Sequence, residues 1–74
     1  MTGGIRQTNE LVKRIEKRLI DLDIRKLEFY RDAGLANSTI SNWRNCNYKA
    51  TPYQIEKVAQ HLGITPEELT EGLT

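Results

Sequence analysis

The segment LEFYRDAGLANSTISNW, from Leu27 to Trp43, predicts two short helices that are joined at Gly34. Glycine adopts a positive φ without the penalty that a Cβ brings, so Gly34 fits the left-handed position at which a helix ends. The first helix spans roughly residues 25–33. Its apolar residues are Leu27, Phe29, Tyr30 and Ala33.

The second helix of this segment, roughly residues 37–45, has an unusual outer face. Ile40 and Trp43 are three residues apart and would anchor the helix on a core, and Leu35 would point back into that core. The remaining positions carry short hydrogen-bonding side chains in place of a solvating mixture of Lys and Glu. We interpret this face as a contact surface formed by Asn37, Ser38, Thr39, Ser41 and Asn42.

Helices are also predicted on both sides of this pair. Upstream, an apolar stripe predicts a helix that begins at Thr8 or Asn9, either of which is a good N-cap; the stripe is Leu11, Ile15, Leu19 and Leu22. Downstream, TPYQ at residues 51–54 and TPEE at residues 65–68 each combine a capping box with a proline at the first helical position.

No alternating run of β-branched residues competes with these helices, so the sequence predicts an all-α, compact five-helix bundle. The length of 74 residues fits one domain, which we expect over residues 9–74, after a flexible N-terminal arm at residues 1–8. No apolar run is long enough to cross a membrane. The single cysteine, Cys46, excludes an internal disulfide framework and suits a reducing, cytoplasmic setting.

Charge is distributed unevenly along the chain. Residues 1–49 have a net charge of +4, whereas residues 50–74 have a net charge of −3. The basic part contains the helix pair around Gly34, which makes an anionic partner plausible for that pair.

Catalytic chemistry is not indicated. His61 and Cys46 lie on different predicted elements, and neither a phosphate-cradling glycine loop nor a metal-binding histidine pair is present. Asp21 and Asp23 fall at a predicted helix end beside basic residues, where a solvated turn explains them. We therefore expect no enzyme activity, no metal and no cofactor.

Residues 26–43 resemble the helix-turn-helix of the lambda-type phage repressor and Cro family, also called the XRE family. The matching motifs are KLEF at residues 26–29, GL at 34–35, STIS at 38–41, and Trp43. Further on, Ile55, VA at residues 58–59, LGIT at 62–65 and the Glu68, Leu69 and Gly72 positions look like the family's fourth and fifth helices. The resemblance covers about residues 9–73 and implies a lambda repressor-like DNA-binding domain.

In this family the second helix of the motif lies in the major groove of DNA. By resemblance, the residues that contact bases are Asn37, Ser38, Thr39, Ser41 and Asn42, and those that contact phosphates are Lys26, Arg44, Asn45 and Lys49. Asn can pair bidentately with adenine, and Ser and Thr can donate or accept. Arg6 on the arm could also reach DNA, although a mobile tail explains it as well.

The resemblance implies a transcriptional repressor or regulator of phage or mobile-element type, acting in the bacterial nucleoid or a phage-infected cell. Its partner would be double-stranded DNA with an operator-type site, bound by a homodimer. By resemblance, the dimer surface would be the fifth helix and the residues near Leu69 and Leu73. The alternative is a protein-protein interaction module on the same helical scaffold, because fold does not dictate function.

Four positions depart from the family's pattern. Tyr30 replaces a small residue, so either its ring turns outward or helices two and three cross more widely. Ala36 replaces a capping Ser or Thr, which makes Asn37 a candidate cap. Cys46 replaces a glycine, so the left-handed residue is expected at Asn45 or Asn47. Arg44 replaces a frequent Glu and adds positive charge.

Overall fold

The computed structural model describes residues 4–73, and these form five helices: α1 Thr8–Leu22, α2 Lys26–Asp32, α3 Asn37–Arg44, α4 Pro52–Leu62 and α5 Pro66–Thr70. Within the described residues there is no strand; one isolated antiparallel bridge joins Ile5 and Ala50. The predicted all-α fold of five helices is confirmed, and the predicted helix bounds agree with the observed ones to within one residue for α2 and α3.

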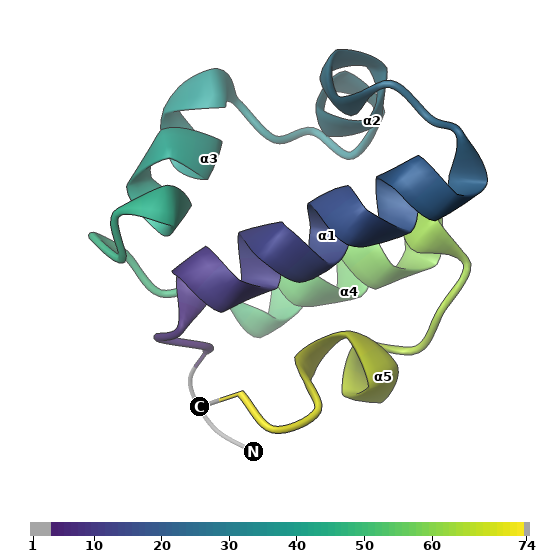
Figure 1. Ribbon diagram of the computed structural model, residues 1–74. Coiled ribbons are helices and arrows are strands. Elements are labelled where there is room, and N and C mark those ends of the chain that lie inside the picture. The colour runs from purple at the N-terminus through teal and green to yellow at the C-terminus, as the bar shows by residue number, and fades with distance from the viewer. Residues whose placement is uncertain (1–3, 74) are drawn as a thin grey trace.

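The helix α1 is the centre of the bundle. It packs against α3, α4 and α5, and Figure 1 shows α1 and α4 side by side, with α5 below them and α2 and α3 on the opposite side. Its buried stripe lies in one core with Trp43 of α3 and Val58 of α4; the stripe consists of Leu11, Val12, Ile15 and Leu19. This core fixes the orientation of α3.

Local capping explains where the last two helices begin. The Thr51 side chain accepts from the backbone N–H of Gln54 at 3.2 Å, and the Gln54 side chain accepts from the backbone N–H of Thr51 at 3.0 Å. The predicted capping box of α4 is therefore confirmed. At α5, Thr65 accepts from the backbone N–H of Glu68 at 3.1 Å. These bonds satisfy N–H groups that have no partner inside the helix.

The segment before α1 differs from the flexible arm that we expected over residues 1–8. Residues 1–3 lie outside the described residues. Ile5 is buried, and its N–H and C=O each form a 2.9 Å hydrogen bond with Ala50. A Cβ at Gly4 would lie 1.9 Å from the Ala50 carbonyl oxygen, so this close approach requires glycine. Residues 4–8 are thereby packed onto the domain.

Three apolar or capping assignments were wrong. The N-cap position of α1 is Gln7, and Thr8 is a buried helical residue whose hydroxyl donates to the Trp43 carbonyl at 2.7 Å. Leu22 and Leu27, which were assigned to apolar faces, are 40% and 72% exposed. Both lie near the α1–α2 connection, where no described element covers them.

Candidate nucleic-acid interface

The turn between α2 and α3 has the geometry expected at Gly34. Gly34 has a φ of 75°, and the Leu35 N–H donates to the Tyr30 carbonyl at 2.8 Å, which closes the end of α2. Leu35 is buried, as predicted. The turn therefore holds α3 at a fixed angle to α2.

The helix α3 has one buried side and one open side. Ile40 and Trp43 are buried, as predicted, and Trp43 is a core residue. Asn37, Ser38, Ser41 and Asn45 are exposed, whereas Thr39 and Asn42 are half-buried at one border of the open side. The structure thus gathers the predicted base-contacting residues on one helix and leaves three of them fully open.

Asn37 does not cap α3. The N-cap position is Ala36, which has no side-chain cap bond, and Asn37 is the first helical residue with an exposed side chain. Among the described residues, no hydrogen bond holds the Asn37 amide. Asn37 is therefore not the cap that Ala36 had made it a candidate for, and its amide is available to a partner.

Three other Asn side chains, those of Asn42, Asn45 and Asn47, take part in hydrogen bonds within the chain. The Asn45 side chain donates to the Ser41 carbonyl at 3.0 Å, and the Asn47 side chain donates to the Asn42 side-chain oxygen at 3.2 Å. Both bonds are exposed to solvent, where a hydrogen bond contributes little net stability and exchanges readily. The contact with Asn47 engages only the side-chain oxygen of Asn42, so a bidentate contact with a base requires that this oxygen be shared or released.

The end of α3 is closed by Cys46 itself. Cys46 has a φ of 56°, whereas Asn45 has a φ of −97°, so the expected shift of the left-handed residue to Asn45 or Asn47 was wrong. The Cys46 N–H donates to the Trp43 carbonyl at 3.1 Å and the Asn47 N–H donates to the Asn42 carbonyl at 2.9 Å. These are the two bonds of a Schellman motif, which requires the left-handed residue at this position.

Arg6 and Lys49 lie on the same side of the domain, beside this end of α3. The Ile5–Ala50 bridge brings the two chain segments together, and both side chains line one shallow pocket of about 220 Å³. Both are exposed, and neither forms an ion pair within residues 4–73. Sequence reasoning left Arg6 on a mobile tail because the pairing partner of Ile5 is 45 residues away.

A second pair of cations flanks α3 on the side of α2. Lys26 at the start of α2 and Arg44 at the end of α3 both bind the carboxylate of Glu16 on α1. The Lys26 Nζ lies 3.4 Å from Oε2 of Glu16, and Arg44 binds both carboxylate oxygens, with 3.4 Å between its Nη1 and Oε1. The hydrogen bond from Arg44 lowers the pKa of Glu16 below its ordinary value of 4.5.

Tyr30 lies under this cluster. Its ring is buried and packs edge-on against Phe29, with 5.8 Å between the ring centroids. The outward rotation considered for this ring is therefore not observed. Its hydroxyl is buried without a hydrogen-bond partner among the described residues, and burial raises the pKa of Tyr30 above its ordinary 10.0. A cavity of about 320 Å³ between α2 and α3 opens above it, lined in part by Lys26, Asn37, Ser41 and Arg44.

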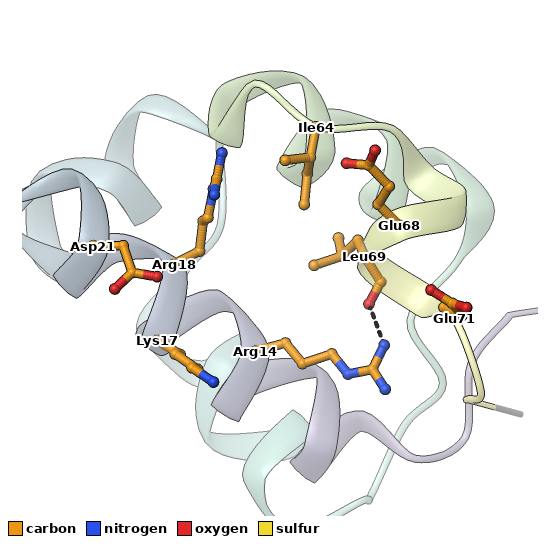
Figure 2. Close-up of a pocket in the computed structure, with 8 residues that line it drawn as sticks. All are labelled: Arg14, Lys17, Arg18, Asp21, Ile64, Glu68, Leu69 and Glu71. Carbon is orange, nitrogen blue, oxygen red and sulfur yellow. Dashed lines mark hydrogen bonds between the residues drawn. The ribbon is translucent and has the colours of Figure 1, made fainter.

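The opposite side of the bundle holds a different pocket, of about 390 Å³, between α1 and α5 (Figure 2). Arg14 extends from α1 to α5, and its guanidinium donates to the Leu69 carbonyl at 3.1 Å. This bond satisfies a carbonyl near the end of α5. The Leu69 side chain is 1% exposed and belongs to the core of a single chain, so a dimer surface on this side would be formed by its exposed neighbours.

Residues 4–73 show neither a metal-binding cluster nor a membrane-spanning helix. No group of three or more His, Cys, Asp or Glu side chains in this part of the chain could hold a metal ion. None of the helices there is long and apolar enough to cross a membrane.

A family model described as the Cro/C1-type HTH DNA-binding domain matches residues 14–71, which is well over half of the chain. The matched span includes α2, Gly34, α3 and the whole of α4 and α5. No curated protein and no solved structure matches the chain.

Proposed function

Because the chain belongs to the family of Cro/C1-type helix-turn-helix DNA-binding domains, we propose that it binds double-stranded DNA sequence-specifically, with α3 in the major groove. Its function would be transcriptional regulation, and more narrowly repression, in a phage or mobile element. The site of action would be the bacterial nucleoid or a phage-infected cell.

One observation carries this proposal. The open side of α3 is short and polar, and pairs of basic side chains lie at both borders of it: Lys26 and Arg44 beside α2, and Arg6 and Lys49 beside the loop to α4. A major-groove reader needs this arrangement, since phosphates flank the groove and the base edges lie between them. Solvation of the domain alone requires neither the short polar side chains nor the flanking basic pairs.

We assign roles from this geometry. Base contacts fall to the open positions Asn37, Ser38 and Ser41, with Thr39 and Asn42 at the border. Phosphate contacts fall to Lys26, Arg44, Asn45 and Lys49. Arg6 joins this set because the bridge between Ile5 and Ala50 holds its segment beside Lys49. Phosphate contacts would set the position of the helix, and base contacts would set the preferred sequence.

We further propose that a homodimer binds the operator. A single small module makes few contacts, and two-fold pairs of such modules bind half-sites about one turn of DNA apart. The burial of Leu69 means that the pairing surface has to come from other residues.

The experiment that tests the base-reading role is selection of bound sites from a random duplex pool, followed by variants of α3. Ser38→Ala and Asn42→Ala should change the preferred bases at distinct positions, with about 1–3 kcal/mol lost for each good contact. Lys49→Ala should weaken binding to all duplexes alike. Gln60→Ala, at an exposed position on α4, is the matched control and should change neither the preferred bases nor the affinity for duplex DNA.

An interaction with another protein is the second candidate function, and one observation favours it. Ile20 and Leu27 are 78% and 72% exposed, and with Ile24 they line a groove of about 690 Å³ at the α1–α2 connection. Exposed apolar surface of this kind is typical of contact sites. The double variant Ile20→Ser, Ile24→Ser separates the two functions: neither residue lines the cavity between α2 and α3, so duplex binding should be unchanged.

A further inference from the structure

The clearest feature that the proposed function does not explain is the carboxylate of Glu16. Glu16 lies on α1, yet it binds one cation from the start of α2 and one from the end of α3. Its side chain is 22% exposed, while those of Lys26 and Arg44 are 58% and 48% exposed. The carboxylate is thus held below two more accessible cations.

A carboxylate in this position offers the two cations what a phosphate would offer. A carboxylate is planar and a phosphate is tetrahedral, but both are anions whose oxygens accept hydrogen bonds from ammonium and guanidinium groups. Arg can bind either of them in a bidentate way. Arg44 already binds both oxygens of Glu16. One negative charge therefore neutralises half of the positive charge on the α2 side of α3.

The other border of α3 has no such acid. Within residues 4–73, Arg6 and Lys49 form no ion pair, although they line a common pocket. The two borders of the same helix therefore differ in one respect that matters for phosphate binding, which is whether the cations already have an anionic partner.

We propose that Glu16 is an internal competitor of DNA phosphate for Lys26 and Arg44, and that it limits the non-specific affinity of the domain. This inference rests on the proposed function. Phosphates carry no sequence information, so an acid that competes with them weakens binding to all duplexes alike. It leaves the contribution of base contacts on α3 intact and thereby raises the share of affinity that depends on sequence.

The test is duplex binding by Glu16→Gln, measured by fluorescence anisotropy over a series of salt concentrations. Gln keeps the shape of the side chain and removes its charge. Affinity for a random duplex should rise by roughly threefold to tenfold at low salt, and the slope of log affinity against log salt should steepen by about 0.9, the value for one more neutralised phosphate.

Glu10→Gln is the matched control. Glu10 is also on α1, and its described ion pair is with Lys13 at 3.5 Å, away from Lys26 and Arg44. Both variants change the net charge equally, so a purely global charge effect would be the same in both. Equal effects of the two variants would overturn the proposal, and so would weaker binding by Glu16→Gln, which would make Glu16 a positioning residue for the cations.

A second set of variants tests whether the effect of Glu16→Gln on affinity depends on Lys26 and Arg44. In a chain with Lys26→Gln and Arg44→Gln, the further change Glu16→Gln should no longer raise affinity; an undiminished rise there would also contradict the proposal.

Failure of this inference is distinguishable from failure of the proposed function. If the unaltered chain binds duplex but Glu16→Gln does not differ from Glu10→Gln, only the inference falls, whereas if no chain binds duplex at low salt, both fall.

Discussion

The Thr8 hydroxyl donates a 2.7 Å hydrogen bond to the Trp43 carbonyl, 35 residues further along the chain. This buried bond joins the start of α1 to the last turn of α3. The same carbonyl also accepts from the Cys46 N–H at 3.1 Å, so the end of α3 is fixed from two directions. The position of α3 therefore depends on a threonine outside the helix-turn-helix.

Thr8→Val should lower the free energy of unfolding by about 1 kcal/mol, because it removes one buried hydrogen bond while keeping the side-chain shape. Urea denaturation followed by circular dichroism measures this loss. Thr8→Ser retains the hydroxyl and should preserve the bond, at the cost of one methyl group. A Thr8→Val chain that is as stable as the unaltered chain would contradict the assigned role.

Cys46→Gly should stabilise the domain. Cys46 adopts a φ of 56°, which a Cβ disfavours, so glycine should raise the free energy of unfolding by about 1 kcal/mol. Gly34→Ala is the reverse control. Gly34 has a φ of 75°, and no heavy atom lies within 4 Å of the Cβ that alanine would add. Its free energy of unfolding should therefore fall by about 1 kcal/mol because of backbone conformation alone. A loss of stability in Cys46→Gly would show that the thiol makes a favourable contact.

Tyr30→Phe should also stabilise the domain, or leave it unchanged, although it removes a polar group. The Tyr30 hydroxyl is buried and has no partner among the described residues, and such a group costs about 1–3 kcal/mol when it is left unsatisfied. Thermal and urea unfolding of the two chains measure the difference. A marked destabilisation would mean that an ordered water or another group satisfies the hydroxyl.

Glu16 should make stability depend on pH in the acid range. Its pKa is lowered in the folded chain by Arg44 and Lys26, so ionised Glu16 favours folding above the ordinary value of 4.5. This contribution is lost as the pH falls from that value through the lowered pKa. Urea unfolding of the unaltered chain and of Glu16→Gln, each at pH 6 and pH 3, measures it. The difference between the two chains should shrink at pH 3, and a difference that is constant with pH would refute the coupling.

Much of the fold could be predicted because its signals are local. The capping box at Thr51, the proline after it and the positive φ at Gly34 each depend on residues within a few positions of one another. The buried pair Ile40 and Trp43 followed from helical spacing in the same way. These signals placed the helices and the turn between α2 and α3 without knowledge of the packing.

The contacts that define the site could not be predicted, because they join residues far apart in the chain. Ile5 pairs with Ala50, and Glu16 binds Arg44 across 28 residues. Arg44 was noted as a basic residue where the family often has an acidic one, but nothing local pointed to its partner on α1. Periodicity also misplaced Leu27, since an apolar residue at helical spacing is buried only where another element covers it.

The affinity of the unaltered chain for a random DNA duplex, measured by anisotropy from low to high salt concentration, tests the central claim most directly. If α3 and its flanking cations form a DNA-binding surface, log affinity should fall linearly with log salt, with a slope of about −0.9 for each phosphate that is neutralised. The absence of duplex binding even at the lowest salt concentration, or an affinity that does not change with salt, would contradict the account.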